Sequence, residues 1–462
     1  MIDFNNIPNI YFLGIGGIGM SALARFAKAQ GKNVAGYDLT ATPLTRALES
    51  EGIQIHYTDD INQLPNTYQS INSLVVRTPA VPESLNELKW LSDRGYHIVK
   101  RSELLGFLTT GHYCVAVAGT HGKTSVSTMI AHLLHQSDVE VGAFLGGISR
   151  NFQSNLVLPS SSNSIVVTEA DEFDRSFLQL SPSLAVVTSV EPDHLDIYGN
   201  FDAVKEAFAG FVEKTRTDGK VLFHKRVNIM HHLSRDVDAL FYSIDDEADF
   251  CLKNLRIEQG AYVFDFYAPF MVIHDVRMNY PGRVNLENMV GAMAAAIIAG
   301  ADPMKVRDAV ATYKGVARRF DIRFKNEKIT YIDDYAHHPG ELSATIKSVR
   351  ELYPGKKVLG VFQPHLYSRT KDFAEGFARS LDMLDELILL EIYPAREKPL
   401  LGINSSIILN KMKIERKSLA MVKDVVGLLS WKEFDVLLTM GAGNIDMVVG
   451  DIEEMLTLKY SK

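Results

Sequence analysis

The chain has 462 residues, of which 46% are hydrophobic and 23% are charged, and its formal net charge is −8 at pH 7. This length favours about three domains at roughly 100–200 residues each, and the mild negative charge argues against a nucleic-acid binder that works by bulk electrostatics. The N-terminus has no basic region ahead of an apolar stretch, and the sequence has no apolar run long enough to span a membrane. The only cysteines are Cys114 and Cys251. We therefore expect a cytoplasmic protein without a membrane partner.

The first predicted unit contains a nucleotide-binding pattern. An apolar strand at 10–13 leads into the glycine-rich segment 14–19, and a helix is expected from 20 to 30. A second strand ends at Asp38, which lies 38 − 14 = 24 residues after the first glycine. This order fits the G-x-G-x-x-G fingerprint with an acidic residue for a ribose. The motif alone does not separate NAD from a UDP-sugar, and a purely structural turn is the alternative. The expected contacts are Gly14, Gly16, Gly17, Gly19 and Asp38.

The second predicted unit begins with the most informative stretch of the chain. A buried strand at 113–118 precedes a glycine-rich loop, and a helical pattern follows from 126 to 134. The loop is a shortened P-loop, because the usual spacing would place its first glycine at Val117. Backbone amides and the helix dipole favour phosphate at such a loop. We therefore expect an ATP site formed by Gly119, Thr120, His121, Gly122, Lys123, Thr124 and Ser125, with the Thr124 hydroxyl on Mg²⁺. A chance glycine-rich turn is the alternative.

Acidic segments follow the next two predicted strands. The strand at 165–168 ends in the acidic run 169–172, and the strand at 184–188 is followed by a segment that contains His194. Carboxyl ends of parallel strands face the ligand crevice, so we expect a Mg²⁺-coordinating carboxylate and His194 there. Solvated loop charge is the alternative. Residues 213–275 read as a peripheral β-rich insertion.

The last part of the chain predicts a further α/β domain. Ahead of it, a helix carries Asn285 and Asn288, which are three residues apart and are expected on one exposed face. Capping explains at most one of them, and the other could contact a ligand. A basic linker at 315–320 marks a domain boundary, and the adjacent His337 and His338 do not form a zinc motif. Beyond the linker, strands that end in polar loops before helices predict a doubly wound domain, with the strands at 330–332, 358–362, 387–390 and 436–440.

Together these segments resemble the Mur ligase family, ATP-dependent enzymes that add amino acids to the UDP-linked peptidoglycan precursor. The motifs that carry the resemblance occur in the family's order and cover nearly the whole chain; they lie at 14–21, 119–124, 169–172, 333–339 and 362–365. The resemblance implies an α/β chain with a Rossmann-like UDP-sugar domain at 1–109, a central P-loop ATPase-like domain at 110–316 and a Rossmann-like amino-acid domain at 317–462.

The resemblance also implies a reaction and a site. Within the family, the motifs are most similar to those of the branch that joins L-alanine to the lactyl carboxylate of UDP-N-acetylmuramate through an acyl phosphate, with release of ADP and phosphate. The implied catalytic residues are Lys123, Glu169, His194, His338 and Arg369. Thr124, Glu169 and His194 would hold metal, and Asn285, Asn288, Arg319 and Asp334 would join the P-loop around ATP. His56 would lie with Asp38 on the uridine side, and His338, His365 and Arg369 on the amino-acid side. The oligomeric state stays open.

Three other functions compete with this interpretation. A recycling ligase of the same family would join an intact tripeptide to the same acceptor, but Gly16-Gly17 and the segment 363–365 favour the alanine branch. An NAD-dependent oxidoreductase would use only the segment 14–19 and would leave Lys123 and Glu169 without a role. A non-catalytic, ATP-gated regulator would release no ADP in the presence of alanine.

Overall fold

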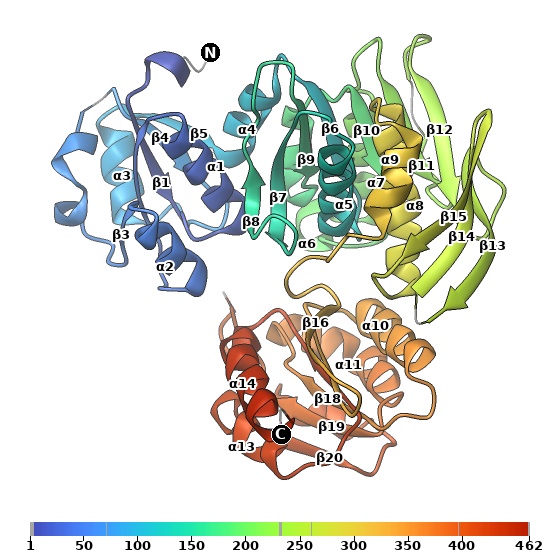
Figure 1. Ribbon diagram of the computed structural model, residues 1–462. Helices are drawn as coiled ribbons and strands as arrows, with labels where there is room; N and C mark the ends of the chain where they lie inside the picture. The colour runs from blue at the N-terminus through green and yellow to red at the C-terminus, as the bar shows by residue number, and fades with distance from the viewer. Residues whose placement is uncertain (1–3, 71, 231–232, 260, 396, 461–462) are drawn as a thin grey trace. The chain divides into compact units, whose positions relative to one another are not determined.

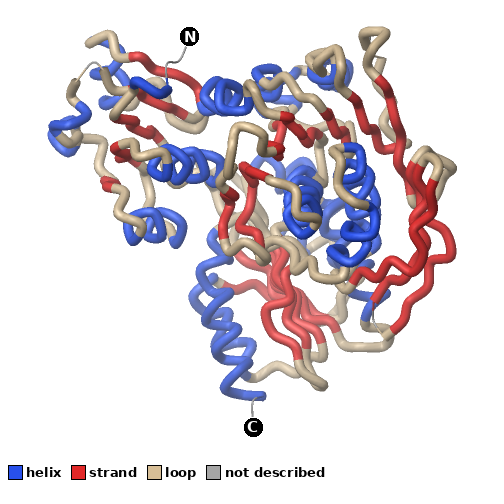
Figure 2. Tube along the Cα trace, turned by 45° about the horizontal axis from the view of Figure 1, so that its top comes forward, coloured by secondary structure: helices blue, strands red, loops and turns tan. Residues whose placement is uncertain are grey.

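The computed structural model describes residues 4–70, 72–230, 233–259, 261–395 and 397–460 (Figure 1). Strands in these segments form three sheets, of five, ten and six strands, so the α/β architecture expected from the sequence is confirmed. The chain separates into two compact units, one of residues 1–279 and 287–314, the other of residues 280–286 and 315–462. The first unit holds the first two sheets and the second unit holds the third. Figure 2 shows blue helices packed against the red strands of these sheets.

The first sheet is parallel throughout, in the order β3-β2-β1-β4-β5. The strand order reverses beside β1, and the glycine-rich segment 14–17 leaves the carboxyl end of that strand. A ligand crevice forms at such a reversal in open α/β sheets. The elements are β1 (Asn9–Leu13), α1 (Ile18–Ala29), β2 (Asn33–Tyr37), α2 (Pro43–Ser50), β3 (Gln54–His56), β4 (Leu74–Arg77), α3 (Asn86–Asp93), β5 (His97–Lys100) and α4 (Arg101–Thr109).

The second sheet runs in the order β15-β14-β13-β12-β11-β10-β6-β9-β7-β8. One face of its centre is covered by α7, since Phe208 and Phe211 join the same apolar core as Ala116 and Val187. The elements are β6 (Tyr113–Ala118), α5 (Lys123–Gln136), β7 (Val141–Ser149), β8 (Ser154–Val157), β9 (Ile165–Ala170), a 3₁₀ segment η4 (Phe173–Gln179), β10 (Leu184–Val187), α6 (Leu195–Tyr198), α7 (Phe201–Val212), β11 (Lys220–His224), β12 (Asp238–Ser243), β13 (Phe250–Glu258), β14 (Ala261–Ala268), β15 (Met271–Met278), α8 (Arg283–Ile298) and α9 (Pro303–Val310).

Residues 213–275 are β-rich as expected, but the expectation that they form an insertion is wrong, because their strands extend the central sheet. Strand β11 pairs in parallel with β10, and β12 and β13 continue the same sheet before two antiparallel strands close its edge. The core residues Val221 and Phe223 of β11 are buried. The sequence of this segment suggests a separate insertion, because it does not show which strand pairs with β10.

The third sheet has the order β16-β17-β21-β18-β19-β20, and only its edge strand β16 is antiparallel to its neighbour. Separate apolar cores lie on its two faces, one including residues of α10 and α11, the other residues of α13 and α14. This is the doubly wound domain expected from the sequence. The elements are β16 (Asp321–Lys325), β17 (Thr330–Asp334), α10 (Pro339–Leu352), β18 (Val358–Phe362), α11 (Tyr367–Leu381), β19 (Glu386–Leu390), α12 (Ser406–Leu409), β20 (Lys417–Ala420), α13 (Val425–Ser430), β21 (Val436–Met440) and α14 (Val449–Tyr460).

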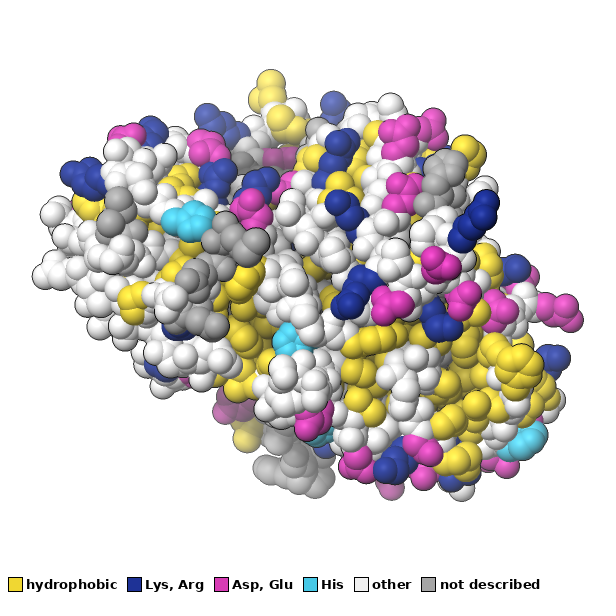
Figure 3. Space-filling model, turned by 90° about the horizontal axis from the view of Figure 1, so that it is seen from above, with side chains coloured by type: hydrophobic (Ala, Val, Ile, Leu, Met, Phe, Trp, Pro, Cys, Tyr) yellow, Lys and Arg dark blue, Asp and Glu magenta, His cyan; other side chains and the backbone are white. Residues whose placement is uncertain are grey.

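The surface agrees with the mild overall charge. On the face drawn in Figure 3, Lys and Arg side chains are interspersed with Asp and Glu, and the described residues there form no continuous basic stripe. In the described part of the chain, no helix combines the length and the apolar character that crossing a bilayer requires.

Candidate functional site

The loop between β6 and α5 has the backbone of an anion-binding turn. Gly119 and Gly122 adopt φ values of 149° and 89°, which L side chains rarely adopt. A Cβ on Gly119 would lie 2.0 Å from the hydroxyl of Thr188, so the turn has no room for a side chain there. Gly122 is the N-cap of α5, and no side chain caps it. The first amides of the helix are therefore available to an anion.

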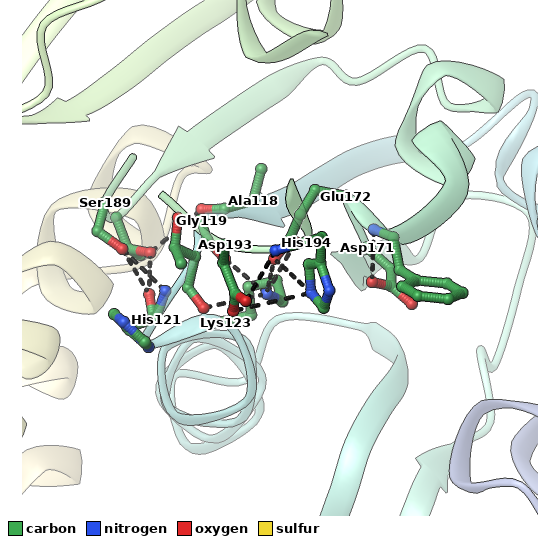
Figure 4. Close-up of polar contacts among 12 residues, drawn as sticks. Ala118, Gly119, His121, Lys123, Asp171, Glu172, Ser189, Asp193 and His194 are labelled. Atoms are coloured by element: carbon green, nitrogen blue, oxygen red, sulfur yellow. Dashed lines mark hydrogen bonds and ion pairs between the residues drawn. The ribbon is translucent and has the colours of Figure 1, made fainter. Parts of the chain in front are cut away.

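The same loop is fastened to the end of β10. The amide of Thr120 donates to the carbonyl of Ser189 at 3.1 Å. The amide of His121 donates to the Ser189 hydroxyl at 2.8 Å (Figure 4). These bonds hold Thr120 and His121 in place before any ligand binds. The end of the loop at Gly122, where α5 begins, is left to bind the ligand.

Lys123 forms an ion pair with Glu172, a carboxylate to which the sequence motifs give no separate role. Its Nζ donates to Glu172 Oε1 at 2.8 Å and to the carbonyl of Gly119 at 2.6 Å (Figure 4). Burial works to lower the pKa of Lys123, but Glu172, Asp171 and Glu169 together raise it above its ordinary value. Burial raises the pKa of Glu172, and Lys123 opposes that shift. The loop thus holds an ammonium group beside the uncapped first turn of α5.

Glu169 lies beside the first turns of α5. Its Oε1 accepts hydrogen bonds from the amide of Gly146 at 2.8 Å and from the Ser127 hydroxyl at 3.4 Å. The carbonyl of Thr124 lies 3.2 Å from the same hydroxyl and is the alternative acceptor for its one proton. The structure therefore brings the two residues expected to bind Mg²⁺, Thr124 and Glu169, to one end of one helix. A hydroxyl and a carboxylate are oxygen donors that suit Mg²⁺.

His194 adjoins the ion pair. It has φ 52°, and its Nε2 lies 4.0 Å from Glu172 Oε1 and 3.8 Å from Asp193 Oδ2 (Figure 4). Its ring packs edge-on against Phe173, with centroids 5.3 Å apart. In the described residues, no three His, Cys, Asp or Glu side chains converge as a ready metal cluster. Magnesium often relies on one or two carboxylates, water and substrate phosphates, so the donors at Thr124 and Glu169 fit that ion.

A cavity of about 250 Å³ in the first unit lies between the acidic residues Glu169 and Asp171 and the glycine-rich segment. The side chain of Arg101 lines it, and its Nη2 donates to Asp171 Oδ2 at 3.0 Å. A Cβ on Gly19 would lie 2.7 Å from the same guanidinium. Arg101 and Asp171 were not predicted as site residues, because a basic residue opening a helix and one acid within an acidic run give no distinctive sequence signal.

The residues expected on the uridine side lie at neighbouring strand ends. The carboxylate of Asp38 accepts from the amides of Gly16 at 2.8 Å and Thr40 at 3.2 Å. The Nε2 of His56 is 2.7 Å from the hydroxyl of Tyr11. Asp38 therefore holds the glycine-rich loop itself, and His56 is joined to the interior of the first sheet.

The two asparagines of α8 do not share an exposed face. Asn285 donates from Nδ2 to the carbonyl of Pro281 at 2.7 Å, which is a local contact at the start of the helix. Asn288 is only 8% exposed, and its Oδ1 would lie 3.0 Å from a Cβ on Gly122. The expected shared surface is wrong because Asn288 packs against the P-loop.

In the second unit, the expected amino-acid-side histidines lie among aromatic side chains. His338 caps α10 by accepting from the amide of Gly340 at 3.4 Å, and its ring is 4.8 Å from that of Phe373. His365 stacks on Tyr393 at 5.8 Å and meets the ring of His337 at 6.1 Å. Burial lowers the pKa of His337, Glu341 opposes the shift and nearby Arg369 adds to it.

Asp334 shapes the loop that leads to these histidines. Its carboxylate oxygens accept from the amides of Phe320 at 2.9 Å and Ala336 at 2.8 Å. Burial raises the pKa of Asp334 to about 6, and Arg319 opposes that shift. The guanidinium of Arg319 lies over the ring of Tyr335, 5.1 Å from its centroid.

Comparison with family models accounts for most of the chain. The model of the Mur ligase family catalytic domain matches residues 9–113, the Mur ligase middle domain matches residues 117–296, and the Mur ligase glutamate ligase domain matches residues 318–443.

Individual proteins show the same likeness. A UDP-N-acetylmuramate–L-alanine ligase of Parabacteroides distasonis is 48% identical over 462 residues, covering 100% of both chains. The crystal structure of a UDP-N-acetylmuramate–alanine ligase from Thermotoga maritima gives a TM-score of 0.83 at 26% identity, covering 98% of this chain and 100% of that one. A murein peptide ligase from Psychrobacter arcticus gives 0.70 at 22% identity, covering 97% of this chain and 98% of that one, and shows the fold alone.

Proposed function

The chain belongs to the Mur ligase family, and we propose that it catalyses the ATP-dependent ligation of L-alanine to UDP-N-acetylmuramate in the synthesis of the peptidoglycan precursor. The observation that carries this function is the 48% identity, over the whole of both chains, to a ligase of that name. The Lys123–Glu172 pair at an uncapped helix end supports it, because that geometry suits a phosphate-transferring enzyme.

ATP activates the lactyl carboxylate in this reaction. A carboxylate has no leaving group and resists attack by an amine, so the lactyl carboxylate first takes the γ-phosphoryl group and ADP leaves. The alanine nitrogen then attacks the carbonyl carbon of the acyl phosphate, and phosphate leaves as the tetrahedral oxyanion collapses. Phosphoryl transfer requires mainly positioning and charge neutralisation, which Lys123 and the amides of the P-loop supply.

We assign the Mg²⁺ donors to Thr124 and Glu169. His194 lies close to the carboxylate of Glu172. When bound, the ion neutralises phosphate charge. Lys123 holds the phosphate oxygens, and Glu172 holds Lys123 at the loop before ATP arrives. The remaining ATP contacts in this proposal are Asn285, Asn288, Arg319 and Asp334.

The acceptor and the amino acid use other parts of the chain. The glycine-rich segment with Gly14, Gly16, Gly17 and Gly19 binds the UDP-sugar, as its place at the strand-order reversal supports. In the second unit, Arg369 stabilises the oxyanion, and His338 or His365 takes the proton of the alanine ammonium group. The proposed domains at 1–109, 110–316 and 317–462 are supported by the three family-model matches. We place the reaction in the cytoplasm; the two cysteines are free and buried.

The decisive experiment measures ADP release by the purified protein with ATP, Mg²⁺ and UDP-N-acetylmuramate. Parallel reactions contain L-alanine, the L-alanyl-γ-D-glutamyl-diaminopimelate tripeptide or no acceptor, and Lys123→Met is the control. We expect turnover that depends on L-alanine and is absent in the control. Turnover with the tripeptide alone would assign a recycling ligase, and no turnover with either acceptor would favour an ATP-gated regulator.

A further inference from the structure

The cavity of the first unit is lined by elements from two different sheets. Residues 17–20 belong to the glycine-rich start of α1, a helix that follows a strand of the first sheet. Residues 144–146 of β7 and Glu169 of β9 belong to the second sheet. The start of α1 and Glu169 therefore line the same space, and the distance between them depends on how α1 is held against the second sheet.

Asn155 of β8 holds α1 through three hydrogen bonds. The residue is 0% exposed. Its Nδ2 donates to the carbonyl of Ile18 at 2.6 Å and to the hydroxyl of Ser21 at 2.9 Å. Its Oδ1 accepts from Arg25 Nη1 at 2.5 Å. All three partners belong to α1, so one buried side chain of the second sheet contacts two successive turns of this helix.

The partners determine which way the Asn155 amide points. A carbonyl can only accept and a guanidinium can only donate, so Nδ2 has to face Ile18 and Oδ1 has to face Arg25. The guanidinium is fixed in turn by Glu51, to which Nε and Nη2 donate at 2.9 and 2.6 Å. Both amide hydrogens of Asn155 are engaged, so the side chain holds the helix and has no hydrogen left to donate to a ligand.

Strand pairing connects Asn155 to Glu169. Leu156, the residue after Asn155, pairs with Phe144 of β7. Phe144 pairs with Thr168 of β9, the residue before Glu169. Neighbouring strands are joined by backbone hydrogen bonds at a spacing of about 4.8 Å. The position of α1 relative to Asn155 therefore also sets its position relative to Glu169.

Apolar packing by itself defines this position less closely. The rings of Phe26 and Phe144 lie 5.5 Å apart and join α1 to β7. Apolar burial has no directional preference, so a helix held by it alone can shift along the strand. A shift of α1 away from Asn155 would leave buried polar groups unpaired, which is costly. The hydrogen bonds of Asn155 thus select one position of the helix.

We propose that Asn155 is a positioning residue for the ligation reaction, because it sets the distance between the glycine-rich start of α1 and Glu169. The acceptor spans this distance, with its diphosphate at the glycine-rich segment and its lactyl carboxylate at the ATP site; this statement rests on the proposed function, whereas the hold on α1 does not. The ion pair of Arg101 with Asp171 joins the same two parts of the unit at another point of the cavity wall. Loss of the Asn155 bonds therefore shifts α1 without detaching it.

Asn155→Asp tests this role at constant side-chain volume. The carboxylate still accepts from Arg25, but it has no hydrogen for Ile18 or Ser21 and places a negative oxygen against the Ile18 carbonyl. Ser21→Ala is the milder variant, since it removes one of the three bonds and adds no charge. It decides the question if Asn155→Asp does not fold.

Asn151→Asp is the matched control. Asn151 lies in the same β7–β8 hairpin, and its Nδ2 likewise donates to a carbonyl, that of Thr312, at 2.9 Å. Its Oδ1 accepts from the amide of Lys314 at 2.8 Å. These two partners follow α9 and do not belong to α1, so the substitution makes the same chemical change in the hairpin without releasing that helix.

The first test is hydrogen–deuterium exchange of the full-length protein without ligands, read by mass spectrometry on peptides that cover residues 18–29. We expect exchange there to be about fivefold faster in Asn155→Asp than in wild type, because α1 opens more easily once its hold is lost. Asn151→Asp should stay within about twofold of wild type. Equal exchange of α1 in wild type, Asn155→Asp and Ser21→Ala would overturn the proposal.

The second test separates positioning from stability by kinetics well below the unfolding temperature. With UDP-N-acetylmuramate and L-alanine, kcat should fall about tenfold in Asn155→Asp and about threefold in Ser21→Ala. The Kd for UDP and the KM for ATP should stay within about twofold of wild type, because each of these ligands uses one side of the cavity only. A purely structural role would lower the unfolding temperature and leave kcat unchanged.

The outcomes have distinct meanings. An unchanged kcat in both α1-releasing variants, or an equal fall in Asn151→Asp, would overturn the positioning role. Changes in the Kd for UDP and the KM for ATP as large as the change in kcat would also overturn it, since they indicate general damage to the fold. A wild-type protein with no activity on UDP-N-acetylmuramate would contradict the proposed function, while hydrogen exchange would still decide whether Asn155 holds α1.

Discussion

At the scale of single residues, the Lys123–Glu172 pair explains how a buried ammonium group is stabilised when no phosphate is bound. The Lys123 side chain is 17% exposed and that of Glu172 is 4% exposed, so both charges have lost most of their hydration. Each charge is stabilised by the other, and the ammonium is held at the uncapped end of α5. A phosphate that binds at this end provides negative charge in competition with Glu172.

Replacing Glu172 with Gln is therefore expected to have two opposite effects. The unliganded protein loses about 3 kcal/mol of stability, because removing one partner leaves a buried charge unpaired. Mg²⁺-ATP supplies that missing charge, so the rise in unfolding temperature on adding ATP becomes larger than in wild type. Differential scanning fluorimetry measures both effects, with Lys123→Met as the control that loses the ATP response. Equal ATP responses in Glu172→Gln and wild type would contradict competition for Lys123.

The buried carboxyl group of Glu87, in the first turn of α3, leads to a prediction about the pH dependence of stability. Between its ordinary value of 4.5 and its folded value of about 7, Glu87 is protonated in the folded chain and ionised in the unfolded chain. The folded state then binds more protons, so the contribution of Glu87 to the free energy of unfolding falls as pH rises through this range. Glu87→Gln lacks that contribution, so its stability relative to wild type should increase from pH 4.5 to about pH 7 and then level off. Urea-unfolding midpoints of both proteins across this range measure the difference; a constant difference would show that Glu87 is ionised when folded.

The sequence predicts part of this residue-level arrangement. Lys123, Glu169 and His194 follow from motif spacing and from the rule that parallel strand ends face a crevice. Which acid of the run 169–172 meets Lys123 does not follow, because the direction of each side chain depends on the backbone after β9. That backbone includes Asp174 and Arg175 at φ 50° and 60°, conformations that no local motif predicts.

At the scale of elements, the glycine-rich turn before α1 contains glycines of two kinds. A Cβ on Gly16 would lie 2.8 Å from the carboxylate of Asp38 and 2.6 Å from a methyl group of Thr45. A Cβ on Gly17 would meet nothing closer than 3.5 Å, and Gly17 has φ −64°, which any residue adopts. Gly17 nevertheless caps α1 and lines the cavity of the first unit.

These two positions form a matched pair of variants. Gly16→Ala should destabilise the protein by about 1–3 kcal/mol, because its methyl group overlaps the residues that hold the loop. Gly17→Ala should change stability by less than about 0.5 kcal/mol but weaken UDP-N-acetylmuramate binding about tenfold, since it adds a methyl group at a residue that lines the cavity. Thermal unfolding and isothermal titration calorimetry measure the two quantities. Unchanged affinity in Gly17→Ala would mean that the acceptor does not approach this end of α1.

Element boundaries were predicted more successfully than element partners. The strands of the first and third sheets appear where apolar runs precede polar loops, since each buried parallel strand carries its own signal. Pairing is a long-range property, and so the local sequence pattern does not reveal that β11 pairs with β10. For the same reason, the 3.6-residue period placed Asn285 and Asn288 on one helix face but could not show that Asn288 is covered by the P-loop.

At the scale of the whole molecule, the proposed chemistry is divided between two units. Lys123, Glu169 and the glycine-rich segment belong to the first unit, and His338 and Arg369 belong to the second. The chain passes between the units near residues 279–280, 286–287 and 314–315. Gly315 at the last crossing has φ 91°, and a Cβ there would lie 2.4 Å from the ring of Tyr280.

Ligation requires reacting atoms within about 3.5 Å of one another, so the roles proposed for His338 and Arg369 require the second unit to reach the acyl phosphate proposed to form in the first. We therefore expect small-angle X-ray scattering to give a smaller radius of gyration with a non-hydrolysable ATP analogue, UDP-N-acetylmuramate and L-alanine than without ligands. Lys123→Met, which lacks the ammonium group for the nucleotide phosphates, should show a weaker response at the same ligand concentrations. Identical profiles for wild type with and without ligands would contradict closure, and the second unit would then have to meet the acyl phosphate without any change in the arrangement of the units.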